Sequence, residues 1–105
     1  MNKLFTKLFI IILLLFSLNV SAVEIRGRID TRNPYNGYFQ PFPRAEVALA
    51  IPNGPIVKVT YTGFDGFYYF YGIAPGNYIL IINRGRNYPV FIPNVPGYDI
   101  PPVLF

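Results

Sequence analysis

Residues 66–82 have the sequence GFYYFYGIAPGNYILII and decide the fold class. The aromatic run 67–71 and the aliphatic run 78–82 are each preceded by a glycine that permits a turn. Pro75 and Gly76 interrupt the chain between them, because Pro fixes φ and Gly allows positive φ. The stretch therefore predicts two short strands joined by a sharp corner, with Tyr78 placed to bond its hydroxyl back to the corner backbone.

Alternating apolar and polar side chains predict four further strands around this stretch, at residues 23–30, 45–51, 57–62 and 88–92. Residues 33–43 are predicted to be a loop rich in aromatics, and the tail 93–105 to hold one short edge strand among its prolines. No segment after residue 22 shows helical spacing. Six or seven short strands separated by turns favour an all-β sandwich or barrel.

Three stretches resemble the carboxypeptidase regulatory-like domain: IRGRI at 25–29, PRAEVAL at 43–49 and the whole of 66–82. The last resembles that family's glycine turn, aromatic-x-aromatic strand, proline-glycine corner and Tyr-x-Leu-x-Val strand. Two departures are Gly63, where the family often has Asp, and Ala74, where it has Pro. The resemblance covers residues 23 to about 92. It implies a single domain, 23–105, with a prealbumin-like antiparallel β-sandwich of Greek-key type and about seven strands.

The N-terminus predicts export. Lys3 and Lys7 precede an uncharged apolar run at residues 8–16, and Val20-Ser21-Ala22 places small residues where a signal peptidase cleaves. We expect residues 1–22 to be a signal peptide that forms an N-terminal helix. Cleavage after Ala22 would give a periplasmic or secreted product. The alternative is an uncleaved segment that anchors the chain to the membrane, although the run is short for a span.

The composition removes several classes of function. After residue 22 the chain has no His, Cys, Trp or Met, which excludes Cys nucleophiles, Ser-His-Asp triads and the usual zinc sites. The formal net charge of +4 includes the two N-terminal lysines, and the remaining bases are scattered, so nucleic-acid binding is not expected. We expect no enzyme activity, no catalytic residue, no metal and no cofactor, because each acidic residue lies on a polar strand face or near a turn. These acids are Glu24, Asp30, Glu46, Asp65 and Asp99.

The candidate binding surface consists of Phe67, Tyr69 and Tyr71. The family pattern turns Tyr68 and Phe70 inward, so the three alternating neighbours point to the opposite face. Such a row of aromatics can stack on sugar rings or bind a partner protein. Alternatively, the loop 33–43 folds over this face and buries it.

The resemblance implies a non-enzymatic binding or structural module of the bacterial envelope, since the family consists mostly of accessory modules on exported proteins. The alternatives are a carbohydrate-binding module that uses the exposed aromatics and, more distantly, an accessory subunit of an enzyme. The expected partner is accordingly a glycan or another envelope protein. Exposed, well-separated rings favour sugar, whereas a continuous apolar face or an open sheet edge favours protein.

Overall fold

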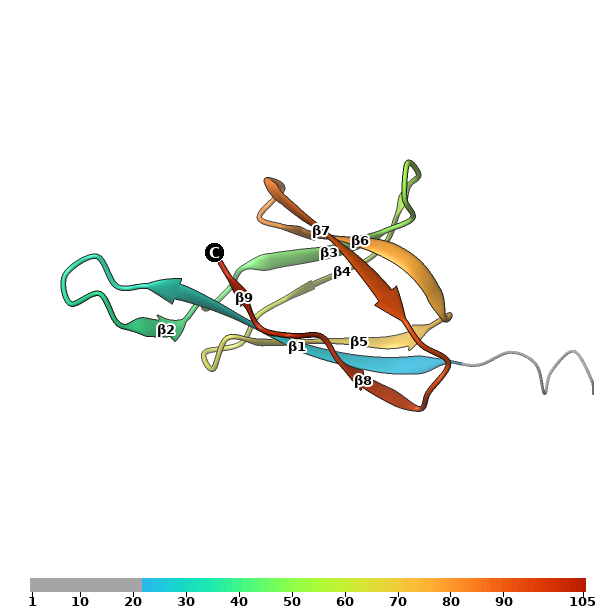
Figure 1. The fold of residues 1–105 in the computed structure, drawn as a ribbon, viewed down its shortest axis with the longest axis horizontal. Coiled ribbons are helices and arrows are strands. Elements are labelled where there is room, and N and C mark those ends of the chain that lie inside the picture. The colour runs from blue at the N-terminus through green and yellow to red at the C-terminus, as the bar shows by residue number, and fades with distance from the viewer. Residues whose placement is uncertain (1–21) are drawn as a thin grey trace, which may run out of the picture.

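Residues 22–105 are described by the structure, a computed structural model, and they form two β-sheets (Figure 1). The strands are β1 (Val23–Arg32), β2 (Phe39–Pro41), β3 (Glu46–Ala50), β4 (Ile56–Tyr61), β5 (Phe67–Ile73), β6 (Gly76–Ile82), β7 (Arg86–Ile92), β8 (Gly97–Asp99) and β9 (Val103–Leu104). In the five-stranded sheet, β2 and β5 pair antiparallel with β1, while β8 and β9 pair parallel with it. The second sheet is antiparallel, in the order β4-β3-β6-β7.

The prediction of an all-β domain is confirmed, and all six predicted strands are present with small shifts at their ends. The predicted signal helix falls on residues outside the described part of the chain. Within that part, no helix is long and apolar enough to cross a membrane.

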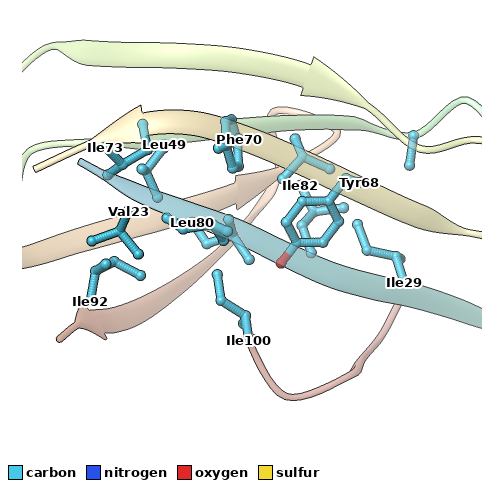
Figure 2. Close-up of a cluster of buried hydrophobic side chains, with 13 residues drawn as sticks. Val23, Ile29, Leu49, Tyr68, Phe70, Ile73, Leu80, Ile82, Ile92 and Ile100 are labelled. Carbon is cyan, nitrogen blue, oxygen red and sulfur yellow. The ribbon is translucent and has the colours of Figure 1, made fainter. Parts of the chain in front are cut away.

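The inner faces of the two sheets share one apolar core (Figure 2). β1 alternates buried and exposed side chains over most of its length, which is why its apolar residues all reach the core while its charged residues do not. The core comprises Val23, Ile25, Ile29, Ala45, Val47, Leu49, Tyr68, Phe70, Ile73, Leu80, Ile82, Ile92 and Ile100. Each fully buried Val, Leu, Ile or Phe stabilises the fold by about 1.5–3 kcal/mol.

One cross-strand pair sets the register of β1 against β5. Gly27 lies directly opposite Tyr68, and a Cβ at position 27 would overlap the Tyr68 ring and hydroxyl. Tyr68 is fully buried, and its hydroxyl has no hydrogen-bond partner among the described residues. Burial also raises the pKa of Tyr68 above its ordinary value, because the charged form loses solvation. Only glycine leaves room for this ring, which covers the backbone of β1.

Two regions differ from the sequence prediction of about seven antiparallel strands. β2 lies within residues 33–43, which were expected to be a loop, and the tail supplies two short strands instead of one. These two strands run parallel to β1 because of the path of the chain. After β7 in the other sheet, residues 93–96 cross to the five-stranded sheet, and β8 begins beside the start of β1. The N–H of Glu24 donates to the carbonyl of Pro96 at 3.0 Å, which fixes this arrival point.

The corner between β5 and β6 is closed by a tyrosine. Gly76 has φ 146°, in the region that favours glycine. The Tyr78 hydroxyl donates to the carbonyl of Ala74 at 2.6 Å. This bond confirms the structural role predicted for Tyr78, which also packs against the core.

Replacing Tyr78 with Phe should lower the free energy of unfolding by about 0.5–1.5 kcal/mol, because it removes one hydrogen bond and keeps the ring. Urea titration followed by circular dichroism measures the change. Tyr35→Phe is the matched control, since Tyr35 is 97% exposed and its change should leave stability unaltered. An identical midpoint for Tyr78→Phe and the wild type would contradict the role.

Candidate functional site

The outer face of the five-stranded sheet presents two tyrosines of β5. Tyr68 and Phe70 are buried, which confirms the predicted parity of the strand. Tyr69 and Tyr71 point the other way and are 44% and 61% exposed. The register places Arg26 of β1 between Tyr69 on one side and Asp99 of β8 on the other. Aromatic and charged side chains therefore stand in adjacent rows on this face.

Phe67, the third predicted residue, is half-buried and differs from the two tyrosines. The guanidinium carbons of Arg26 and Arg28 lie 5.7 and 5.6 Å from the centre of its ring. Both are within the range in which a cation is attracted to the face of an aromatic ring. Two arginine side chains of β1 thus already contact the Phe67 ring. The rings of Tyr69 and Tyr71 are more accessible to a ligand.

An ion pair joins β1 to β8 at the centre of this surface. Arg26 donates to both carboxylate oxygens of Asp99, from Nε at 3.1 Å and from Nη2 at 2.9 Å. This bidentate geometry orients both side chains, although both remain largely exposed to solvent. Hydrogen bonding to Asp99 and its charge raise the pKa of Arg26, so the guanidinium stays charged.

Two adjoining clefts share this ion pair. The first, about 370 Å³, is lined by Glu24, Ile25, Arg26, Tyr69, Tyr71, Gly97, Tyr98 and Asp99. The second, about 320 Å³, is lined by Arg26, Gly27, Arg28, Phe67, Asp99, Ile100 and Pro102. Tyr69 and Tyr71 thus lie together in one cleft, and Phe67 lies in the next. The Arg26–Asp99 pair borders both.

The alternative that residues 33–43 cover this face is wrong. β2 pairs with β1 only at residues 30–32, whereas Tyr69 lies opposite Arg26, further toward the start of β1. The β1–β2 hairpin instead extends beyond the end of the sheet, as Figure 1 shows. Tyr35 and Tyr38 in this hairpin are themselves exposed.

Sequence reasoning missed the polar half of the site. Glu24 was assigned to a polar strand face and Asp99 to the neighbourhood of a turn, and neither was linked to the tyrosines. The alternation of β1 did place Glu24 and Arg26 on one face. The position of Asp99 depends on the parallel pairing of β8 with β1, and a three-residue strand between prolines carries no periodic signal that reveals its partner.

The acidic side chains have evident structural partners. Arg28 donates to Asp30 at 2.8 Å, Arg84 donates to Glu46 at 3.0 Å, and Asp65 accepts from the N–H of Phe67 at 3.0 Å within its turn. Together with Arg26 and Asp99, these contacts account for four of the five acids. Glu24 is exposed at the rim of the first cleft.

A scan against protein-family models matches none of them, and a search of curated proteins finds no match. The resemblance to the carboxypeptidase regulatory-like domain therefore stays a prediction from the residues. Two exposed rings beside charged hydrogen-bonding groups can hold a ligand that has both an apolar face and polar edges.

The double variant Tyr69→Ser, Tyr71→Ser should remain folded and lose about 1–2 kcal/mol of stability, because Tyr71 is mostly in solvent and Tyr69 is 44% exposed. Phe70→Ala, on the same strand but facing the core, should cost about 3–5 kcal/mol. Thermal and urea unfolding measure both. A double variant as damaged as Phe70→Ala would show that something covers the two rings.

Proposed function

We propose that this protein is a non-enzymatic, exported binding module, and that its ligand lies on the outer face of the five-stranded sheet. The observation that carries the proposal is the exposure of Tyr69 and Tyr71 beside Arg26 and Asp99 in one cleft. Adjacent exposed aromatic side chains that line one cleft are typical of an interaction site, whereas a single exposed aromatic is not. Tyr68, Phe70 and Ile73 of β5 pack in the core and Phe67 packs against Arg26 and Arg28, so Tyr69 and Tyr71 are the aromatic rings of β5 that are available to a ligand.

The fold proposed for this module is the prealbumin-like β-sandwich that the resemblance implies. Its support is the strand order: β5-β1-β8 in one sheet and β4-β3-β6-β7 in the other, around a shared core. In this arrangement the candidate surface is the solvent face of one layer, away from the core. A ligand there touches β1, β5 and β8 without disturbing the packing between the sheets.

A non-enzymatic role is supported by the way the acids are held. Both oxygens of Asp99 accept hydrogen bonds from Arg26, so this carboxylate is held as the partner of the arginine, and each oxygen keeps one lone pair that can accept from a ligand hydroxyl. Glu24 is the second carboxylate of the cleft, but a glycosidase needs two carboxyl groups with opposed and separate roles. Asp99 serves instead to orient Arg26 as a hydrogen-bond donor at the cleft.

Among ligands, a carbohydrate is the class that this surface suits best. A pyranose ring presents C–H groups on its faces and hydroxyls at its edge, so it stacks on an aromatic ring while its hydroxyls bond to neighbouring polar groups. Tyr69 and Tyr71 supply rings, and Glu24, Arg26 and Asp99 supply acceptors and donors. The fully buried centre of a protein–protein interface is depleted of charged residues, whereas on this face charged side chains lie between the aromatic rows.

Export is supported by the position of the predicted cleavage site relative to the fold. β1 begins at Val23, and Val23 is fully buried at the edge of the core. Cleavage after Ala22 therefore leaves the first strand whole and removes nothing that the described core uses. The proposed location is the periplasm or the medium.

Mass spectrometry of the protein from a host that exports it should show Val23 as the first residue. The small side chains at Val20 and Ala22 are what a signal peptidase recognises. Ala22→Leu is the control, and it should block or shift the cut. A full-length chain starting at Met1 in the membrane fraction of the wild type would refute the cleavage.

Binding should be measured on an array of bacterial polysaccharides and on isolated peptidoglycan sacculi. We expect the wild type to be retained and the variant Tyr69→Ser, Tyr71→Ser to lose at least about tenfold in affinity, since each stacked ring contributes of the order of 1 kcal/mol. Tyr35→Ser, Tyr38→Ser removes two exposed tyrosines from the β1–β2 hairpin and should bind as the wild type does.

Two outcomes would overturn this assignment. A folded wild type that none of these glycans retains would rule out the carbohydrate class and leave a partner protein for the same face. Glycan binding that survives the double variant would place the site elsewhere.

A further inference from the structure

The edge of the second sheet formed by β4 carries backbone groups that no described residue pairs. β4 pairs with β3 alone. Thr62, just after β4, exchanges hydrogen bonds with Ala45 and Arg44 on the β3 side. In an antiparallel pair, the backbone N–H and C=O groups of every second residue point toward the same neighbour. The backbone groups of Thr60 and Lys58 therefore also point toward β3. Val59 and Tyr61 therefore point their N–H and C=O groups outward, away from the sheet.

The side chains of this edge are apolar on the outer face of the sheet. Thr60 lies opposite Val47 and Lys58 opposite Leu49, both core residues, so Val59 and Tyr61 are on the side away from the core. Val57, Val59 and Tyr61 are 41%, 47% and 61% exposed. These exposed apolar side chains continue as an apolar stripe across the outer face of the sheet, because Val59 pairs with Ala48, and Ala48 pairs in turn with Ile81.

β4 is only partly protected as an edge, by Lys58 and by the register irregularity at its start. β7, at the other side of the same sheet, contains Pro89, which has no N–H to offer. β4 contains no proline, and its one charge is Lys58. The irregular register between β3 and β4 falls at the start of β4, near Ile56, and leaves residues 58–61 regular. Six residues rich in β-branched side chains thus form an edge open to another strand.

The pattern of β4 matches itself when two copies run antiparallel. Because Val59 and Tyr61 hold the outward backbone groups, the centred register places Val59 opposite Val59 of the second copy and Tyr61 opposite Val57. Lys58 then lies opposite Thr60, so the two lysines do not meet. Tyr61 with Val57 is an aromatic–β-branched pair, one of the favourable cross-strand combinations. The hydrogen-bond pattern permits this register, because Val57, Val59 and Tyr61 all face outward, and the register keeps the two lysines apart.

We propose that β4 pairs edge to edge with β4 of a second copy of this chain, with Val59 on the two-fold axis. The two four-stranded sheets join into one continuous sheet, and the apolar stripe of one copy continues into that of the other. The pairing is isologous, so it closes as a dimer and leaves no further β4 edge open. The outer face of the five-stranded sheet, where Tyr69 and Tyr71 lie, takes no part in it.

The test is sedimentation equilibrium of the purified protein, expressed from the full chain in a host that exports it, over a wide concentration range. The wild type should show a monomer–dimer equilibrium. Val59→Lys places two like charges at the axis and should weaken dimerisation at least about tenfold, whereas the exposed position leaves the monomer folded. Mixing Val59→Lys with Val59→Glu should restore association to about the wild-type level, because the charges then attract.

Phe91→Lys is the matched control. It adds the same charge to the same outer face, but on β7 and away from the β4 edge, so dimerisation should change by less than about threefold. Amide hydrogen exchange supplies an independent measurement. The N–H groups of Val59 and Tyr61 should be protected only at concentrations where the dimer forms, and the N–H of Thr60 should be protected in both states.

A wild type that stays monomeric up to about 1 mM, the upper end of weak specific association, would overturn the proposal. So would a dimer that Val59→Lys leaves intact. Dissociation by Phe91→Lys as strong as by Val59→Lys would show that the copies stack through their sheet faces, which also refutes edge pairing. None of these results depends on glycan binding, so the two proposals stand or fall separately.

Discussion

The packing of Tyr68 over Gly27 is the constraint on which much of the structure depends. The ring is the largest fully buried side chain, and it lies where any Cβ on residue 27 would sit. Gly27 is the one glycine of β1, so the Tyr68 ring fits against β1 only at that position. The register of β1 against β5 is fixed in consequence, and with it the face to which every other residue of β5 points. A shift of one residue would exchange the buried and exposed aromatics of that strand.

The candidate surface follows from that register in two steps. The pairing of Gly27 with Tyr68 sets Arg26 opposite Tyr69, because the next pair along the two strands must lie on the opposite face. β8 then approaches β1 from the other side and brings Asp99 to Arg26. Aromatic and charged groups meet because β1 lies between β5 and β8. The bidentate contact with the carboxylate fixes the orientation of the arginine side chain.

The two sheets present chemically different outer faces. The five-stranded sheet has charged side chains from β1 between the aromatic row of β5 and the short strand β8, so polar and apolar groups alternate across it. The outer face of the four-stranded sheet is apolar across β4, β3 and β6, and the ion pair between Glu46 and Arg84 lies at an end of the sheet. A ligand with polar edges suits the first face, and an extended strand suits the edge of the second. The proposed ligand surface and the proposed β4 pairing edge therefore lie on different sheets, so the two proposed interactions do not compete.

The sequence by itself determined the strands, the turns and the inward or outward direction of side chains within each strand. These are local properties: alternation has period two, Gly66 and the Pro75-Gly76 corner restrict φ, and Tyr78 reaches only a few residues back. Only the tertiary structure decided which strands are neighbours. β2, β8 and β9 are too short, and lie too close to prolines, for periodicity to reveal them. β2 pairs with the preceding strand β1, whereas β8 and β9 pair with a strand at the other end of the described chain. Strand pairing brings Glu24 and Asp99 next to the tyrosines, and it also leaves β4 as an open edge. The free energy that selects these strand pairings comes from burying the shared core between the two sheets.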